Sequence, residues 1–448
     1  MRILFFSHYF PPEVNAPASR TVENCRRWVR AGHDVTVVTC APNCPDGIVY
    51  DGYKNRLWQS ETIDGIRVVR VWTYVAANKG TMRRILNFLS YMFSAVVASL
   101  LLKRPDVIIA TSPQFFCGWA GRIAGLLRRV PFILEIRDLW PDTIVAVGAM
   151  TNGRLLSVLE CLERWMYAGA THIVTVGEGY KAKLIEKGVP PQKIDIITNG
   201  ADLTFFTPRP PDEALKRSLG LEGKYICSYI GTLGMCSGLD VVPRAAEILR
   251  DKGSDRIVFL LVGDGAIRER LEQTVREKQL TNVVFTGRQD KAMMPRFLSM
   301  TDVCLAHLQR NDLFKTVLPS KIFEAAAVRK PIVLGVEGCA ADLVRRAGAG
   351  VCIEPENAEQ LAAAVETLAE DPQLQQTYAT SGYDHVTKHF NRETLAAEYL
   401  QVVARIANTA DLEQADRDRS RSTGRPHAHS DLNPRRKPLS ADNVRNRL

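Results

Sequence analysis

Short apolar runs rich in valine and isoleucine alternate with longer stretches of helical periodicity along most of this chain. Such alternation is typical of parallel β-sheets whose neighbouring strands are joined by crossover helices. The runs are almost continuously apolar, which indicates strands covered by helices on both faces. The pattern occurs twice, so the sequence predicts an α/β protein with two doubly wound, Rossmann-like domains.

The expected strands divide the chain into two comparable halves. In the first half they lie at 3–7, 35–39, 67–71, 107–111, 132–136, 173–176 and 195–198, and in the second at 225–230, 257–262, 283–286, 303–306, 332–336 and 351–353. The predicted organisation is a first domain at 1–205, a proline-containing linker at 206–221 and a second domain at 222–390. A last amphipathic helix at 391–408 precedes a polar tail at 410–448, which is expected to be disordered.

Length and composition fit this organisation. The 448 residues suit two domains of roughly 200 residues each. A hydrophobic share of 46% and a charged share of 24% are normal for a soluble enzyme. The net charge of +9 favours polyanions or anionic lipid head groups as partners. No stripe of basic residues interleaved with aromatic ones is present, which argues against nucleic acid as a partner.

Cysteine and histidine placement predicts no metal site and a reducing compartment. The ten cysteines include no C-x-x-C pair. His385 and His389 have helical spacing but no third ligand nearby, so solvated helix surface is the expected role. The first apolar run ends at Ser7 and is too short for a signal peptide, and the protein is expected to be cytoplasmic.

One long uncharged stretch, at 85–102, leaves three alternatives open. It has 18 residues and is flanked by Arg83-Arg84 and Lys103-Arg104. This length is at the lower limit for a bilayer span, although the stretch lies between two strands of one expected sheet. A buried crossover helix, a peripheral contact with the inner membrane and a true span all remain open.

Ligands of doubly wound sheets bind beyond the carboxyl ends of the strands, so the loops there are the candidate sites. Two glycine-containing loops follow strands of the second half, Gly231-Thr232-Leu233-Gly234 and Gly263-Asp264-Gly265. Each loop would let a phosphate approach the backbone, or would simply be a tight turn. No G-x-G-x-x-G follows any strand, which removes the main support for a nicotinamide or flavin dehydrogenase.

The segment Pro319-Ser320-Lys321-Ile322-Phe323-Glu324 is the strongest candidate for a donor site. Ser320 is expected to be the N-cap of a helix whose free amides bind a diphosphate. Lys321 and Glu324 share a helix face, where a cation beside phosphate and a carboxylate beside sugar hydroxyls would hold one nucleotide. The alternative is an ordinary ion pair at i, i+3 spacing.

The first half contains two further candidate loops. Arg137, Asp138 and Trp140 follow the strand at 132–136, where they would face a ligand or form a buried Arg–Asp pair that holds the loop. His8 and Glu13 belong to a rigid, proline-containing loop after the first strand, which is expected to wall an acceptor pocket.

These motifs together resemble family 4 of the retaining glycosyltransferases, over residues 1–408 and in order. The branch that includes bacterial N-acetylfucosamine transferases of surface polysaccharide assembly is the most similar. The motifs that carry the resemblance are Tyr9-Phe10-Pro11-Pro12-Glu13, the segment 32–39, Arg137-Asp138-Leu139-Trp140-Pro141, Asn199-Gly200-Ala201-Asp202, both glycine loops and Pro319-Ser320-Lys321-Ile322-Phe323-Glu324.

The resemblance implies a GT-B fold whose last helix returns to the first domain. It implies a donor site in the second domain, an acceptor site in the first, retention of anomeric configuration and no catalytic metal or other cofactor. Glu324 would hold the donor ribose, while Gly231–Gly234 and Ser320-Lys321 would meet the diphosphate. Arg288 would line the nucleobase or diphosphate pocket, and Asp138 would lie near the reacting sugar or the acceptor hydroxyl.

The sequence departs from the family at two positions. A second glutamate usually stands eight positions before the retained one, where this chain has Thr316. A cation usually follows the first glycine loop, where this chain has Met235-Cys236-Ser237. We therefore expect charge neutralisation from Lys321, Arg288 or Arg137.

The expected substrates are a nucleotide-diphosphate sugar, UDP-linked and N-acetylated or deoxy, and a lipid-linked sugar or glycan acceptor. Two alternatives remain at this point. One is a nucleotide-sugar epimerase of the same architecture, and the other is a non-catalytic peripheral membrane scaffold.

Overall fold

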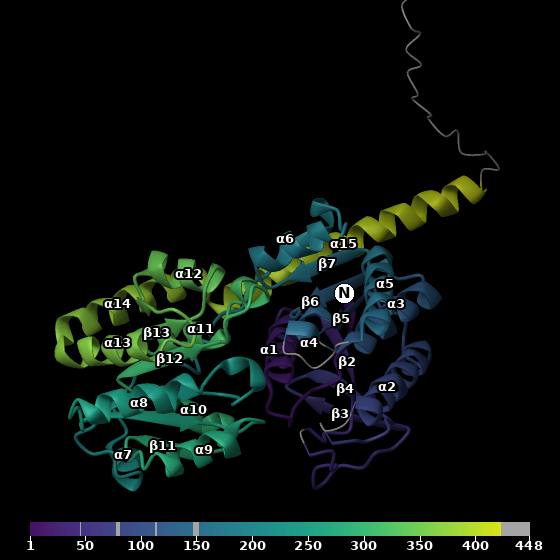
Figure 1. Cartoon of the computed structure of the whole chain (residues 1–448). Coiled ribbons are helices and arrows are strands. Elements are labelled where there is room, and N and C mark those ends of the chain that lie inside the picture. Colours follow the sequence, from purple (N-terminus) through teal and green to yellow (C-terminus); the bar gives the residue numbers. More distant parts are fainter. Residues whose placement is uncertain (45, 78–80, 113, 147–151, 423–448) are drawn as a thin grey trace, which may run out of the picture. The chain divides into compact units, whose positions relative to one another are not determined.

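The fold is described from a computed structural model, which describes residues 1–44, 46–77, 81–112, 114–146 and 152–422. The chain forms two Rossmann-like domains, as the alternation of strands and helices predicts (Figure 1). The first domain has an eight-stranded sheet in the order β3-β4-β2-β1-β5-β6-β7-β8. Its strands are β1 Arg2–Phe6, β2 Asp34–Cys40, β3 Trp58–Ile63, β4 Ile66–Val71, β5 Val107–Thr111, β6 Phe132–Ile136, β7 His172–Thr175 and β8 Ile194–Ile196.

The second domain has a six-stranded parallel sheet in the order β11-β10-β9-β12-β13-β14. Its strands are β9 Tyr225–Ile230, β10 Ile257–Val262, β11 Val283–Gly287, β12 Val303–His307, β13 Ile332–Gly335 and β14 Gly350–Cys352. All thirteen strands expected from the sequence are present within one or two residues at either end. The strand missed was β3, which pairs antiparallel with β4 at the sheet edge and has no continuous apolar run.

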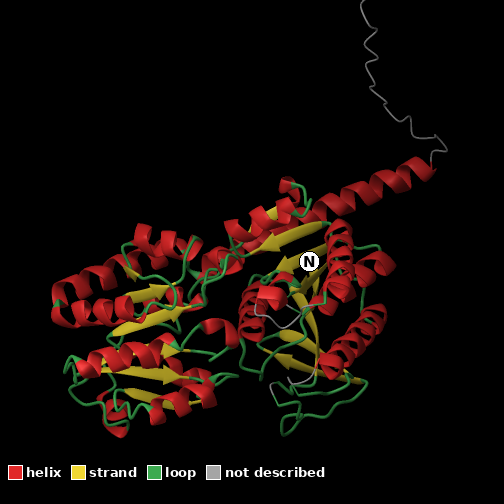
Figure 2. Ribbon diagram, in the orientation of Figure 1, coloured by secondary structure: helices red, strands yellow, loops and turns green. Residues whose placement is uncertain are grey.

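Helices cover both faces of both sheets (Figure 2). The helices of the first domain are α1 Ala16–Arg30, α2 Thr81–Leu101, α3 Phe115–Arg128, α4 Asp142–Ala146, α5 Gly153–Gly169 and α6 Glu178–Glu186. Those that follow are α7 Glu213–Ser218, α8 Val241–Asp251, α9 Arg268–Glu277, α10 Met294–Met300, α11 Ser320–Ala327, α12 Cys339–Ala347, α13 Ala358–Glu370, α14 Pro372–His389 and α15 Arg392–Ser422. The short helix α7 lies inside the segment expected to be a linker.

Successive residues of the buried strands enter cores on opposite faces, as strand geometry requires. Leu4 and Phe6 of β1 pack with α2, α3 and α5 on one face. Ile3 and Phe5 pack with α1 and α15 on the other. This covering on both faces explains why the strands are almost continuously apolar.

The beginning of α15 packs against the first domain, although it follows the second in sequence. Trp28 of α1 donates from Nε1 to the carbonyl of Ala396 at 2.9 Å, and its ring meets Tyr399 edge to face at 5.2 Å. A backbone bridge joins Ala201 and Asn391 at the start of the helix. The helix ends at Ser422, inside the segment 410–448 expected to be disordered, and residues 423–448 of that segment lie outside the described residues.

The apolar stretch at 85–102 forms most of α2, a crossover helix between β4 and β5. It is the one described helix long and apolar enough to cross a membrane, and only 28% of its most apolar window is buried. Tyr91 and Ala95 of its inner face are fully buried, and the Tyr91 hydroxyl donates to the carbonyl of Val38 at 2.8 Å. Because this inner face belongs to the domain core, α2 lies on the sheet with its outer face exposed.

Tyr399 provides a test of this packing. Its ring is fully buried, but its hydroxyl oxygen has no partner among the described residues. Tyr399→Phe is expected to leave the free energy of unfolding unchanged or raise it by about 1 kcal/mol, because an unpaired polar group is removed. Tyr399→Ala is expected to lower it by about 3–5 kcal/mol by leaving a cavity. Urea denaturation of both variants measures the difference, and equal destabilisation by the two would contradict the packing.

Candidate functional site

The glycine loops that follow β9 and β10 pack directly on one another. The amide of Gly231 donates to the carbonyl of Val262 at 2.8 Å, and the amide of Leu233 donates to the carbonyl of Asp264 at 3.0 Å. A Cβ at Gly263 would stand 2.0 Å from the Gly231 carbonyl oxygen, and one at Gly265 would stand 2.4 Å from that of Leu233. Glycine at 263 and 265 is therefore what lets these two backbones approach.

Lys321 of α11 reaches the first of these loops. A Cβ at Gly231 would lie 2.8 Å from the Lys321 Nζ, so the ammonium group stands against the loop backbone. The Nζ also lies 4.7 Å from the centre of the Tyr229 ring, at the end of β9. The structure thus brings Lys321, Gly231 and Thr232 together, as expected for a diphosphate site, with Gly234 at the start of the short helix that follows.

The helix start at α11 differs from the expectation in one detail. Ser320 was predicted to be the N-cap, but Pro319 occupies that position and Ser320 is the first helical residue. Pro319 has extended backbone, with a ψ of 131°, and no side chain caps the helix. The prediction was wrong because the helix begins one residue earlier than the serine cap requires. The uncapped start leaves amide groups that can bind an anion.

Glu324 lies one turn further along α11 and is half-buried. Burial raises the pKa of its carboxyl, while the charges of Arg392 and then Lys321 act to lower it. Among the described residues, no hydrogen bond or ion pair engages this carboxylate, and no ion pair joins it to Lys321 at i, i+3 spacing. Glu324 is therefore a partly accessible carboxylate beside two cations.

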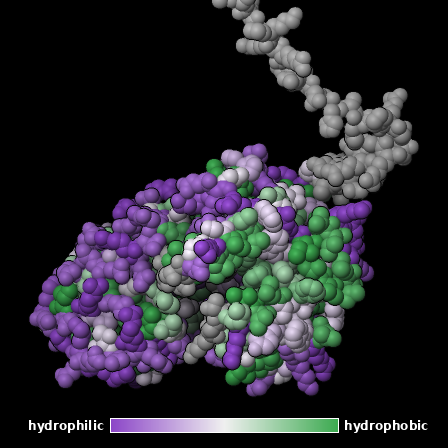
Figure 3. Space-filling view, turned by 45° about the vertical axis from the view of Figure 1, so that its right-hand side comes forward, coloured by the Kyte–Doolittle hydropathy of each residue, from purple (hydrophilic) through white to green (hydrophobic). Residues whose placement is uncertain are grey.

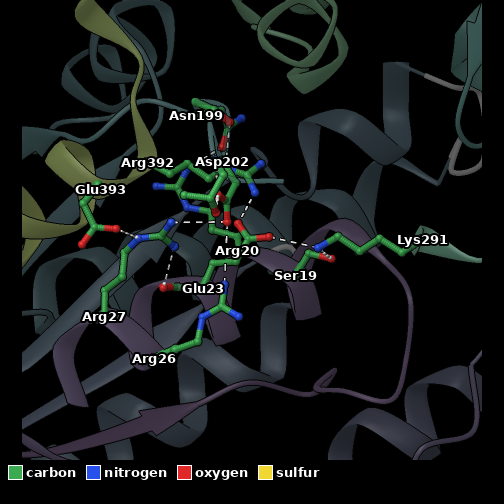
Figure 4. Close-up of polar contacts among 12 residues, drawn as sticks. Ser19, Arg20, Glu23, Arg26, Arg27, Asn199, Asp202, Lys291, Arg392 and Glu393 are labelled. Carbon is green, nitrogen blue, oxygen red and sulfur yellow. Dashed lines mark hydrogen bonds and ion pairs between the residues drawn. The ribbon is translucent and has the colours of Figure 1, made fainter. Parts of the chain in front are cut away.

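A network of ion pairs joins the two domains next to this carboxylate (Figure 4). Glu23 of α1 accepts from the Lys291 Nζ of the second domain at 3.0 Å, and Arg392 pairs with its other oxygen. Arg27 binds Glu393 at 2.6 Å and Asp202 at 3.3 Å. α1 is thus held both to the second domain and to the beginning of α15.

A second set of charged side chains lies around Glu135 of β6 in the first domain. Arg20 donates to the buried Glu135 carboxylate at 3.2 Å and to the carbonyl of Ile197 at 2.9 Å. Burial, reinforced by the neighbouring charge of Arg20, lowers the pKa of Arg137 to about 9. The Arg137 guanidinium therefore lies in an electropositive environment. Among the described residues no ion pair joins it to Asp138, which was one of the two alternatives for this loop.

Asp138 follows the carboxyl end of β6 in the first domain. Burial raises the pKa of its carboxyl, and the Thr143 hydroxyl donates to it. Both Asp138 and Lys321 act electrostatically on the Cys236 thiol, so charged groups of the two domains approach the same place. Trp140 is half-buried and packs on Phe115 with ring centres 4.5 Å apart.

The structure places His8 and Glu13 inside their loop, which does not fit direct contact with an acceptor. Glu13 is buried, and its carboxylate accepts from the amides of Asn43 and Cys44, each at 3.0 Å, and of Phe10. His8 is enclosed by aromatic rings, and burial lowers its pKa to about 3. Proline content predicts a rigid loop, but which side chains turn inward depends on tertiary packing.

Arg288 and Thr316 of the second domain both contact residues of the first domain. The exposed Arg288 guanidinium donates to the Tyr50 hydroxyl of the first domain at 3.4 Å. The Thr316 hydroxyl donates to the carbonyl of Leu313 at 2.7 Å. A Cβ at Gly179 would lie 2.6 Å from the Thr316 Cβ, so this threonine packs against the first domain.

Two family models match the chain in the order of its domains. The Glycosyl transferase 4-like domain matches residues 15–200, and Glycosyl transferases group 1 matches residues 211–385. The chain belongs to these glycosyltransferases. Solved structures also confirm the expected GT-B fold. The structure of Anabaena Alr3699/HepE in complex with UDP-glucose superposes with a TM-score of 0.67 at 17% identity over 90% of this chain and 100% of that one.

Relatives in sequence include enzymes of polysaccharide synthesis. The putative colanic acid biosynthesis glycosyl transferase WcaI of Escherichia coli is 28% identical over 82% of this chain and 91% of that protein. The probable glycosyltransferase WbjE of Pseudomonas aeruginosa is 23% identical over 63% of this chain and 70% of that protein. WaaG, described as involved in lipopolysaccharide biosynthesis, has the same fold, with a TM-score of 0.62 at 14% identity over 89% of this chain and 99% of that one.

The two glycine loops allow a matched test of the site's backbone. In Gly263→Ala the new Cβ would clash with the Gly231 carbonyl, and φ at this position is +138°. We expect this variant to lose about 2 kcal/mol or more of unfolding free energy and to bind nucleotide poorly. In Gly234→Ala the nearest atom is 3.8 Å away and φ is −89°, so normal stability is expected. Thermal melts with and without UDP compare them, and a Gly263→Ala variant as stable as Gly234→Ala would contradict the close packing.

Proposed function

We propose that this glycosyltransferase uses a UDP-linked hexose-type sugar, N-acetylated or deoxy, and transfers it with retention to a lipid-linked sugar or glycan in cell-surface polysaccharide synthesis. The observation that carries this proposal is the position of Lys321 against the Gly231 loop, beside the unengaged carboxylate of Glu324. The names of the relatives support the pathway, and the UDP and UDP-glucose complexes of a structural relative support the nucleotide.

Charge balance favours an anionic donor. Five cations surround this region of the two domains, namely Lys321, Arg392, Lys291, Arg137 and Arg20, against the three carboxylates of Glu324, Glu23 and Glu135. With Asp138 counted as a fourth carboxylate, cations are still in excess, which suits the negative charge of a diphosphate. We propose that these side chains supply the charge neutralisation that a divalent cation supplies elsewhere.

In the proposed reaction the bond between C1 of the sugar and the diphosphate oxygen breaks. The Lys321 ammonium and the free amides at the start of α11 stabilise the negative charge that develops on the leaving diphosphate. Glu324 accepts hydrogen bonds from the donor ribose hydroxyls. The acceptor hydroxyl oxygen forms its bond to C1 from the side of the leaving group, near Asp138 of the first domain, and its proton passes to the leaving diphosphate oxygen. The anomeric configuration is therefore retained. NMR of the anomeric proton in the product tests this retention.

The sugar contacts of this chain are expected to differ from those of family members that have a glutamate at position 316. The hydroxyl of Thr316 is already bound to the carbonyl of Leu313. A second carboxylate for the sugar hydroxyls is therefore missing at this position. This is consistent with a sugar that carries an acetamido or deoxy substituent in place of a hydroxyl.

Lys321 and Glu324 provide the direct test of the donor site. Lys321→Ala is expected to slow transfer by about a hundredfold or more with little change in the unfolding midpoint, because a preorganised cation is lost. Glu324→Gln is expected to weaken donor binding by roughly tenfold, since charge-assisted hydrogen bonds become neutral ones. A thermal-shift screen of nucleotide sugars first identifies the donor, and transfer assays with that donor then compare the variants.

The matched control for Lys321→Ala is Lys315→Ala. Lys315 lies five residues before Ser320 and is engaged with Asp312 at the surface. Its loss should leave transfer unchanged. Full activity in Lys321→Ala, or a large loss of stability instead of rate, would contradict the proposed role.

Sugar conversion on incubation with donor alone would favour the epimerase, which neither the comparisons nor the described site support.

A variant of Asp138 tests whether donor binding and sugar transfer depend on different residues. Asp138→Asn is expected to reduce the transfer rate by about tenfold or more while UDP affinity remains unchanged, because the residue belongs to the acceptor side. Asp142→Asn is the control, since Asp142 is engaged by Lys187 at 2.9 Å. Calorimetry with UDP and initial-rate measurements compare the variants. A loss of UDP affinity in Asp138→Asn would contradict this assignment.

A further inference from the structure

Three helices of the first domain form one layer on the same face of the eight-stranded sheet. α2 packs against α3 and α3 packs against α5 (Figure 1). Buried side chains of all three belong to a single core cluster, including Tyr91, Ala120 and Met166. The helices therefore present their remaining faces to the outside together.

These outer faces are unusually apolar. Eleven of the twenty large apolar side chains that are exposed in the described part of the chain lie on these three helices. Phe93 is 74% exposed, Leu126 is 78% exposed and Trp165 is 59% exposed. Figure 3 shows hydrophobic residues gathered on this side of the first domain. We call this surface the α2–α3–α5 face; its exposed apolar residues are Met82, Leu86, Phe93, Val97, Leu100, Leu101, Leu126, Leu127, Leu155, Val158 and Trp165.

The same helices and their ends are strongly basic. Residues 81–104, 115–129 and 152–169 contain nine arginines and lysines but two acidic residues, Glu160 and Glu163. Glu163 is buried and pairs with Lys187 at 2.8 Å, so it contributes little negative charge at the surface. The basic residues are Arg83, Arg84, Lys103, Arg104, Arg122, Arg128, Arg129, Arg154 and Arg164.

We propose that the α2–α3–α5 face docks this enzyme on an anionic lipid bilayer, in the plane of the membrane surface. Apolar side chains enter the boundary between head groups and acyl chains, while the surrounding cations meet anionic head groups. Trp165 has the amphipathic ring that suits this boundary. The inner faces of the three helices stay in the core, so docking needs no rearrangement of the fold.

Charge favours a bilayer over a second copy of the chain. Two copies meeting through this face would bring their basic residues together, which is unfavourable. A bilayer with anionic lipids offers both an apolar interior and the opposite charge. The observations on the face itself do not depend on the identity of the donor or acceptor.

The position of the face suits a lipid-linked acceptor, a point that rests on the proposed function. Crossover helices run antiparallel to their strands, so α2, α3 and α5 all begin at the carboxyl edge of the sheet, where Asp138 lies. A small cavity there is lined by Asp138, Trp140 and Gln114, with Phe115 of α3 and Tyr167 of α5. The buried Gln114 amide nitrogen has no partner among the described residues.

Vesicle flotation tests the docking face with the full chain. Vesicles of phosphatidylcholine with about one-third phosphatidylglycerol are compared with pure phosphatidylcholine. We expect binding to the anionic vesicles, and a loss of at least about tenfold in binding when salt is raised to about 1 M. No flotation with anionic vesicles would overturn the proposal.

Substitutions define the extent of the face. The double variant Phe93→Glu with Leu126→Glu is expected to bind vesicles at least about tenfold more weakly, because two apolar contacts become anionic. Trp165→Glu alone should also weaken binding severalfold, since α5 belongs to the same face. The control is Leu57→Glu, at a position that is 81% exposed in the loop before β3 and outside the three helices. Equal loss in the control and the double variant would overturn the proposed face.

Two further measurements separate membrane docking from self-association and from donor binding. If size-exclusion chromatography with light scattering shows a dimer that Phe93→Glu dissociates, and flotation is absent, the face mediates self-association and the proposal is wrong. UDP binding by the double variant should equal that of the native chain. Vesicle binding without any nucleotide-sugar binding would overturn the proposed function but leave the docking face in place. Nucleotide-sugar binding without vesicle binding would overturn the docking face alone.

Discussion

The close packing of two glycine loops is the constraint on which the second domain, to which we assign the donor, depends. The backbones at Gly231 and Gly263 approach so closely that a single Cβ at 263 would collide with a carbonyl oxygen. This contact ends β9 and β10 at the same level and leaves room for the Lys321 side chain beside Gly231. In a parallel sheet the loops that follow the strands lie at one edge. Because glycine has no side chain, phosphate can approach the backbone of these two loops.

The domains are connected by charged groups as well as by the chain. Glu23 of α1 is shared by Lys291 of the second domain and Arg392 of α15, and the latter also acts on Glu324. The carboxylate that we assign to the donor therefore lies next to the groups that hold the domains together. A bound diphosphate would add negative charge to this region, where positive charge is in excess. Donor binding and the contact between domains are thus expected to strengthen one another.

Much of the fold followed from the sequence, because near-continuous valine and isoleucine runs identify strands that are buried on both faces. β3 was missed because an edge strand needs no such run. The segment 319–324 was singled out from the spacing of Lys321 and Glu324 at a helix start and from its resemblance to a family motif, and its role as a donor site stays a prediction. The ionic network was not found, since Glu23 and Arg392 are hundreds of residues apart and no local pattern relates them. The inward orientation of His8 and Glu13 likewise depends on contacts with distant residues.

The central claim is that protein cations beside the Gly231 loop recognise a diphosphate. Isothermal titration calorimetry of the native chain with UDP, UMP and uridine tests it most directly. The account predicts that UDP binds on the order of a hundredfold more tightly than uridine, with UMP between them, and that this advantage shrinks as salt is added. Equal affinity for UDP and uridine would contradict it.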